Sequence, residues 1–96
     1  MKYLVVYDIT NDRLRARVAE KLKDYGLRRI QYSAFLGELI PRRLRSLVQD
    51  LRKILGPRPE ERERKVIHVF PVPSSLRGII VIGDEWKEEE GRVEVF

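Results

Sequence analysis

The order of strand-like and helix-like segments restricts the fold of this 96-residue chain more than any other feature. Residues 2–7 are apolar, β-branched or aromatic almost without interruption, which is typical of a central strand buried on both faces, and Asp8 ends this run. Residues 10–12 offer helix N-caps, and apolar residues then recur at helical spacing until Gly26, a suitable C-terminal stop. The chain therefore opens with a strand followed by an amphipathic helix.

The middle of the chain repeats this alternation. Residues 28–39 have a strand-like pattern that changes around Gly37, so they form either one bent strand or two short strands. Pro41 is well placed as the first residue of a second amphipathic helix, because proline at that position loses no helical hydrogen bond. Gly56 is expected to end this helix.

The remaining segments are shorter. Residues 56–64 contain two prolines and alternating charges, which indicates a loop. Residues 65–70 form a strand, and the prolines from Pro71 onward are expected to stop it because proline cannot donate to a β-ladder. Two further short strands are expected at 78–82 and 92–96.

This order, β-α-β(β)-α-β, predicts an α+β fold: a ferredoxin-like βαββαβ sandwich in a single domain spanning residues 1–96. The C-terminal strands are additional to that fold. The apolar segment 79–82 would be a liability at an open sheet edge. We therefore expect a two-fold homodimer in which residues 78–96 pair with the partner subunit's sheet.

Composition excludes several kinds of site. The chain has no cysteine and one histidine, which excludes a disulfide scaffold, a cysteine-ligated metal centre and a thiol nucleophile, and argues against a Ser-His-Asp triad. No apolar run approaches the roughly 20 residues of a membrane span, and no signal-peptide pattern is present. We expect a cytoplasmic protein that does not bind membranes.

Charge is distributed unevenly along the sequence. Residues 13–65 contain 16 basic and 7 acidic residues, whereas residues 84–94 contain 6 acidic and 2 basic residues. A basic body favours phosphate-rich partners, because lysine and arginine release the counterions condensed on nucleic acid. A solvated charged surface is the alternative explanation. The candidate nucleic-acid-binding residues are Arg13, Arg17, Arg42 and Arg45.

Asp8 is the most informative single residue. It follows a buried strand at the point where the chain turns towards a helix, a location that ligand sites on α/β sheets favour. Its carboxylate could hold Mg²⁺, which prefers oxygen ligands and retains several waters. In the homodimer, two Asp8 side chains could face each other and together hold one or two hydrated cations that activate water. Alternatively, Asp8 is a turn residue that caps the first helix.

Other candidates surround this position. Arg15, Arg17 and Arg29 are expected at the same end of the sheet, where they could neutralise a phosphate or stabilise a transition state. Tyr7 and Phe35 could stack on bases, although aromatic residues in strands usually belong to the core. Ser33 is a possible phosphate contact and His68 a structural residue.

Two segments resemble a known family. Residues 3–12, Tyr-Leu-Val-Val-Tyr-Asp-Ile-Thr-Asn-Asp, and residues 28–39, Arg-Arg-Ile-Gln-Tyr-Ser-Ala-Phe-Leu-Gly-Glu-Leu, resemble the opening motifs of the CRISPR-associated protein 2 family. The resemblance implies a ferredoxin-like homodimer that acts in CRISPR adaptation together with the CRISPR integrase, CRISPR-associated protein 1. It also implies Mg²⁺-dependent endonuclease activity on single-stranded RNA or double-stranded DNA.

The resemblance assigns roles to individual residues. The family's metal-binding aspartate corresponds to Asp8, and its other catalytic positions correspond to Tyr7, Arg15, Arg17, Arg29 and Phe35. Two alternatives to this enzyme remain open: a non-catalytic adaptor that holds duplex DNA for the integrase, and a related toxin-type ribonuclease.

Overall fold

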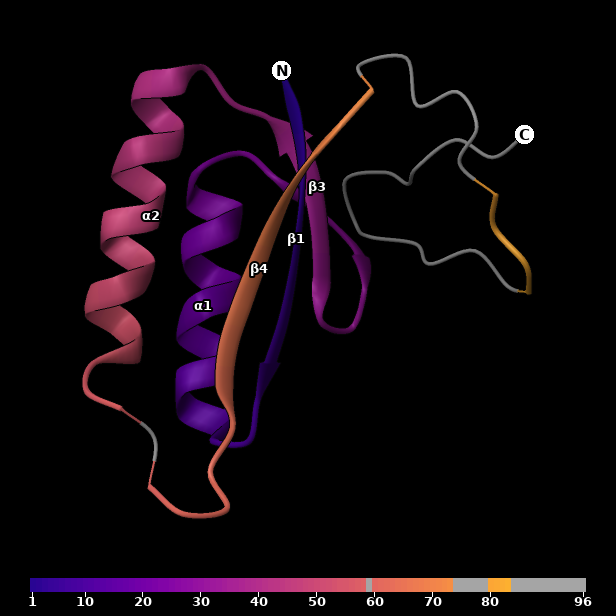
Figure 1. Ribbon diagram of the computed structural model, residues 1–96. Coiled ribbons are helices and arrows are strands. Elements are labelled where there is room, and N and C mark those ends of the chain that lie inside the picture. Colours follow the sequence, from indigo (N-terminus) through magenta and orange to yellow (C-terminus); the bar gives the residue numbers. More distant parts are fainter. Residues whose placement is uncertain (59, 74–79, 84–96) are drawn as a thin grey trace.

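A computed structural model describes residues 1–58, 60–73 and 80–83 of the chain. Its elements follow the order β1 (Lys2–Ile9), α1 (Asp12–Asp24), β2 (Arg28–Gln31), β3 (Ala34–Glu38), α2 (Pro41–Leu55) and β4 (Lys65–Val72). The four strands form one antiparallel sheet in the order β2-β3-β1-β4. Both helices lie side by side against one face of this sheet (Figure 1). The predicted α+β, ferredoxin-like architecture is therefore confirmed.

Local sequence signals explain where the helices begin and end. The Asn11 side chain caps α1 by accepting a hydrogen bond from the Leu14 N–H at 2.9 Å. Pro41 begins α2, as predicted. Gly26 and Gly56 adopt φ values of 87° and 69° just beyond the two helices, in the left-handed region that glycine enters without a steric penalty.

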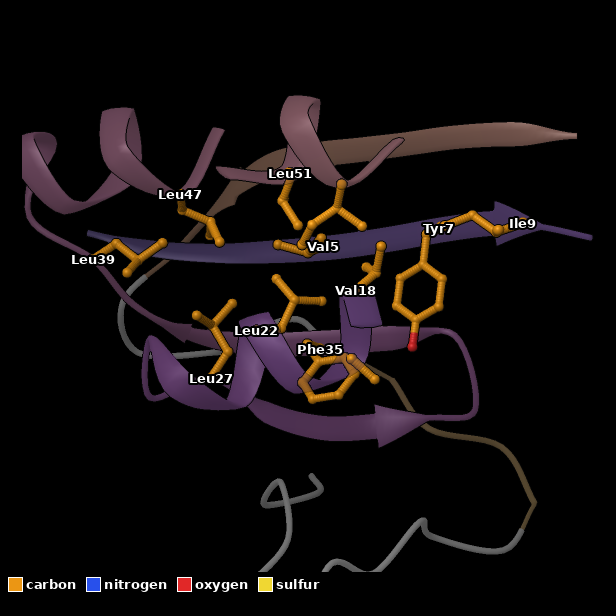
Figure 2. Packing of buried hydrophobic residues seen from close by; sticks show 12 residues of the cluster. Val5, Tyr7, Ile9, Val18, Leu22, Leu27, Phe35, Leu39, Leu47 and Leu51 are labelled. Atoms are coloured by element: carbon orange, nitrogen blue, oxygen red, sulfur yellow. The ribbon is translucent and has the colours of Figure 1, made fainter. Parts of the chain in front are cut away.

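The core lies between the helices and the sheet. Alternate residues of β1 point towards the helices and are buried, whereas the residues between them face the other side. Figure 2 shows the side chains of β1, β3 and both helices converging between the layers, with the Phe35 ring beside Tyr7. The fully buried centre consists of Val5, Val18, Leu22, Phe35 and Leu47, each with 0 % exposure.

The opposite face of the sheet is largely apolar and partly exposed. Among the described residues, no helix covers this face. Directly paired residues share a face of the sheet, so the registers of β1 with β3 and β4 define its members. We call this set the open sheet face; it comprises Lys2, Leu4, Val6, Ala34, Leu36, Glu38, Val66, His68, Phe70 and Val72, with Asp8 at one end. Val66, His68 and Phe70 are exposed and Leu4 and Val6 are half-buried, whereas Ala34 and Leu36 are buried.

The structure corrects the expected boundary of the first strand. β1 continues through Asp8 to Ile9, so Asp8 is a strand residue rather than a turn residue or a helix cap. The sequence also predicts burial on both faces of this strand, but its burial pattern alternates. A central strand in an antiparallel sheet covered on one side needs only one strongly buried face.

The structure also decides between the alternatives for residues 28–39 and corrects the expected end of the strand that contains Pro71. Residues 28–39 form two strands, and the break lies at the Tyr32–Ser33 turn rather than at Gly37. Pro71 does not stop β4, which continues to Val72. In the sheet that the described residues form, β4 is an edge strand, a position where a residue without an N–H is tolerated.

The expected C-terminal strands fall largely outside the described residues. Residues 80–82, the described part of the expected 78–82 strand, have no strand conformation, and Ile82 is 93 % exposed. The expected strand at 92–96 and the expected pairing of residues 78–96 with a partner lie outside the described part of the chain.

Candidate functional site

Asp8 projects from the open sheet face, and Arg64 binds it. Side chains alternate along β1, so Asp8 points away from the helices and its side chain is 56 % exposed. The Arg64 Nε lies 3.0 Å from both carboxylate oxygens of Asp8. The Asp8 carboxylate is thus accessible to solvent but already neutralised by a guanidinium group.

The backbone fixes this pairing. Asp8 is directly opposite Val66 in the β1–β4 register, so Arg64, two residues before Val66, is its diagonal neighbour. The Thr10 N–H donates to the Arg64 carbonyl at 3.0 Å, and the Arg64 N–H donates to the Thr10 Oγ1 at 3.1 Å. These bonds hold the Arg64 main chain next to the end of β1.

A second group of predicted site residues lies on the helix side of the sheet. A pocket of about 200 Å³ is lined by the side chains of Tyr7, Asp12, Arg15, Ala16, Ala19, Arg29 and Tyr32. Tyr7 and Asp8 are adjacent in β1 and therefore point to opposite faces. One subunit alone does not bring the arginines of this pocket and the Asp8 carboxylate to a common cleft.

The pocket residues are bonded to one another. Arg15 pairs with Asp12, and its Nη1 donates to the Ile9 carbonyl at 3.0 Å. The Arg15 guanidinium also lies 5.5 Å from the centre of the Tyr32 ring. The Tyr7 hydroxyl donates to the Tyr32 carbonyl at 3.4 Å. This network ties the β2–β3 turn to the start of α1.

The Tyr7 hydroxyl keeps its proton at neutral pH. Burial raises the pKa of Tyr7, and the nearby Arg29 charge and hydrogen bond only partly oppose that effect. The protonated hydroxyl is the donor in the bond to the Tyr32 carbonyl.

The remaining candidates are dispersed. Phe35 is fully buried with Arg29 above its ring, 5.1 Å from the centre, which leaves no ring surface for a base to stack on. Arg17 lines a different groove, of about 350 Å³, between the helices, together with both basic and acidic residues. Arg17 therefore does not join Arg15 and Arg29. The side chains expected to bind nucleic acid, those of Arg13, Arg17, Arg42 and Arg45, are all exposed on the helix layer.

Ser33 and His68 are the two remaining candidates from the sequence. Ser33 lies in the β2–β3 turn, where its carbonyl accepts the Tyr7 N–H at 3.0 Å. His68 is an exposed residue in the middle of β4, and its ring stacks on Phe70.

The carboxylate oxygens of Asp8 suit a hydrated cation such as Mg²⁺. Within residues 1–58, 60–73 and 80–83, no three His, Cys, Asp or Glu side chains are grouped as metal ligands, so a closed all-protein metal centre is not present there. A single exposed carboxylate fits a hydrated Mg²⁺, which proteins commonly hold through one or two carboxylates and substrate phosphates. The residues present therefore fit a loosely held, oxygen-ligated cation.

Sequence reasoning missed Arg64 and Tyr32. Arg64 lies 56 positions from Asp8, and only the β1–β4 register brings the two together. Tyr32 belongs to a segment whose sequence pattern also allows one bent strand. In the structure a turn forms at Tyr32–Ser33, and the Tyr32 ring there contacts Arg15. Pairing residues 2–9 with residues 65–72 as antiparallel strands would have placed Arg64 beside Asp8.

Comparison with known proteins decides the family. The family profile described as CRISPR associated protein Cas2 matches residues 1–76. The chain belongs to the Cas2 family. Within the part of the chain that the structure describes, no helix has the length and apolar character required to cross a membrane.

Cas2 proteins from several archaea are similar to the chain. It is 49 % identical over 73 residues to "CRISPR-associated endoribonuclease Cas2" of Korarchaeum cryptofilum, covering 75 % of this chain and 72 % of that one. It is 42 % identical over 95 residues to "CRISPR-associated endoribonuclease Cas2 1" of Archaeoglobus fulgidus, covering 95 % and 96 %. A "CRISPR-associated endonuclease Cas1/endonuclease Cas2 fusion" of Thermoproteus tenax is 47 % identical over 53 residues, covering 55 % of this chain and 20 % of the fusion.

A solved Cas2 crystal structure shares the fold. It superposes with a TM-score of 0.66 at 31 % sequence identity and covers 100 % of this chain and 97 % of its own. The ferredoxin-like arrangement described above is therefore one that Cas2 proteins adopt.

Proposed function

We propose that this chain is a Mg²⁺-dependent endonuclease of CRISPR adaptation that cleaves phosphodiester bonds in single-stranded RNA or double-stranded DNA as a homodimer. The observation that carries the proposal is the exposed Asp8 carboxylate at the end of the open sheet face, in a chain of the Cas2 family. The names of the related proteins, which describe endoribonucleases, support the same class of reaction.

The open sheet face supports a homodimer. It exposes large apolar side chains, including Val66 and Phe70, next to half-buried Leu4 and Val6. Apolar surface of this kind is stabilised when a second surface covers it. Asp8 lies on the same face, so a two-fold arrangement of these faces would bring the Asp8 side chains of two copies towards one interface.

The two Asp8 carboxylates are the groups that would hold the cation. A bound Mg²⁺ supplies a Lewis acid that polarises a phosphodiester and lowers the pKa of water. The carboxylates of the chain supply negative charge and oxygen ligands at the interface.

Tyr7, Arg15 and Arg29 are assigned positioning roles. They face away from Asp8 across the sheet, and their contacts connect β1 to the β2–β3 turn and to α1. They therefore influence the Asp8 end of β1 through the backbone and do not touch the phosphate within the same subunit.

Cleavage assays test this proposal. Matched RNA and DNA substrates are incubated with purified wild type, Asp8→Asn and Asp24→Asn, each with Mg²⁺ and with chelator. Asp24 is exposed at the end of α1, so Asp24→Asn controls for the loss of one carboxylate. Cleavage is expected for wild type and Asp24→Asn with Mg²⁺ only, and Asp8→Asn is expected to be inactive. Equal cleavage by Asp8→Asn would refute the assignment.

A second function is favoured by the exposed arginines of the helix layer. Arg13, Arg17, Arg42 and Arg45 are exposed on the two helices, and their guanidinium groups suit phosphate contacts. These side chains would hold duplex DNA for the CRISPR integrase, and the Thermoproteus tenax fusion of Cas1 with Cas2 supports that partnership. Spacer acquisition that survives Asp8→Asn would favour this adaptor role over the catalytic one.

A further inference from the structure

The Asp8–Arg64 pair lies where the proposed cation would bind. The Arg64 Nε is 3.0 Å from each oxygen of the carboxylate, so the guanidinium group contacts both oxygens of Asp8. A cation bound to those oxygens competes with the guanidinium group for the carboxylate, since the two positive charges repel each other and both are attracted to the same negative charge.

The pair is positioned firmly but held weakly. The Arg64 main chain is bonded to Thr10 through its N–H and its carbonyl, which keeps its Cα beside the end of β1. The two charged side chains, in contrast, are 63 % and 56 % exposed. Exposed ion pairs contribute little net free energy, because water solvates both charges and the long side chain loses rotamer freedom. Arg64 can therefore leave Asp8 without disturbing the β1–β4 ladder.

We propose that Arg64 is the resident counter-ion of Asp8 and competes with a divalent cation for the carboxylate. This inference depends on the proposed role of Asp8 as a metal ligand. Arg64 lowers the affinity of the carboxylate for cations, so the site binds a divalent cation with oxygen preference more weakly than the bare carboxylate would. The displaced guanidinium stays tethered next to the site, with donors that suit a phosphodiester.

Direct cation binding tests the proposal without nucleic acid. Mn²⁺, which shares the carboxylate preference of Mg²⁺, is titrated into the full chain, and free Mn²⁺ is measured by electron paramagnetic resonance. The variants are Arg64→Gln and Arg62→Gln. Arg62 is an exposed arginine two residues earlier in the same loop, so its variant controls for the loss of one positive charge. Asp8→Asn reports whether binding requires the carboxylate.

The expected result is Mn²⁺ binding about two- to fivefold tighter in Arg64→Gln than in Arg62→Gln, the range typical of exposed ion pairs. Asp8→Asn is expected to remove the site, and Asp8→Asn combined with Arg64→Gln to show no gain. If Mn²⁺ binding still requires Asp8 but is equal or weaker in Arg64→Gln, the proposed role of Arg64 is overturned and the proposed role of Asp8 as a metal ligand stands. Equal binding in wild type and Asp8→Asn would also overturn the proposed metal ligand.

Discussion

Tyr7 and Asp8 are consecutive residues of β1 whose side chains leave the sheet on opposite faces. Tyr7 lines the pocket beneath the helices, and Asp8 stands on the open sheet face bound to Arg64. The strand is thus the physical link between two groups of residues that the family resemblance placed in one catalytic set. We expect changes in the pocket to reach Asp8 through the backbone of β1, which the β2–β3 turn contacts at Tyr7.

Tyr7→Phe tests this link. The variant keeps the buried ring but removes the hydroxyl that bonds to the Tyr32 carbonyl. If cleavage is observed, kcat is expected to fall about tenfold, or ~1.4 kcal/mol, while KM stays within twofold. Steady-state kinetics measure both parameters. Tyr3→Phe, a change to a partly buried tyrosine at the other end of the same strand, is the control and should match wild type. An unchanged kcat in Tyr7→Phe would remove the positioning role.

Gly37→Ala is expected to destabilise the fold. A Cβ at Gly37 would lie 2.9 Å from the backbone Cα of Leu27, a contact that requires β3 or the loop before β2 to move. Overpacking of this kind costs about 1–3 kcal/mol. Gly26→Ala meets no atom within 4 Å and costs only the left-handed backbone conformation, about 1 kcal/mol. Urea denaturation should rank Gly37→Ala as the less stable variant, and the reverse order would contradict the packing described.

The bond between Tyr25 and Asp50 predicts a pH dependence. The Tyr25 hydroxyl donates to Asp50 Oδ2 at 2.7 Å, and this bond is the main cause that raises the pKa of Tyr25 above its ordinary value near 10. The folded chain then holds the proton more tightly than the unfolded chain does. The bond therefore stabilises the fold fully below about pH 10, and its contribution is lost as pH rises through the raised pKa.

Denaturation of wild type and Tyr25→Phe measures this contribution. The difference in free energy of unfolding is expected to be about 0.5–1 kcal/mol at pH 7, the lower part of the range for a hydrogen bond, because the pair is partly exposed. The difference should shrink at strongly alkaline pH. A difference that grows as pH rises would contradict the assigned direction.

The element order and the helix boundaries could be predicted because they depend on local signals. Pro41, Gly26 and Gly56 act through their own backbone preferences, which neighbouring elements scarcely alter. The extent of the strands depends on their neighbours. Pro71 remains in a strand because β4 lies at the edge of the sheet formed by the described strands, and edge position is a property of the sheet as a whole.

The candidate site could be predicted only as a set of residue types. The sequence pattern identifies Asp8 as a carboxylate at the end of a strand, but its place within β1 and its contact with Arg64 depend on strand length and register. The same alternation within β1 separates it from Tyr7 and thereby from Arg15 and Arg29. Linear sequence places these residues near one another, whereas the pleat of the strand assigns them to different faces.

The exposed arginines predict a salt-dependent affinity for nucleic acid. Replacing Arg42 and Arg45 together by alanine should weaken binding to a DNA duplex and reduce the slope of log affinity against log salt by about one for each phosphate that these side chains neutralise. Fluorescence anisotropy over a range of salt concentrations measures both quantities. Arg28→Ala, on strand β2 away from the helix layer, serves as the control. A slope unchanged by the double substitution would exclude this surface.

Cysteine crosslinking tests most directly whether the two Asp8 side chains meet. The chain contains no cysteine, so Asp8→Cys introduces one thiol per subunit, and Asp24→Cys places the control thiol at the end of α1. A short bifunctional maleimide reagent is then added to each purified variant. The account predicts a covalent dimer for Asp8→Cys and none for Asp24→Cys. Efficient crosslinking at position 24 with none at position 8 would contradict a catalytic centre shared across the open sheet face.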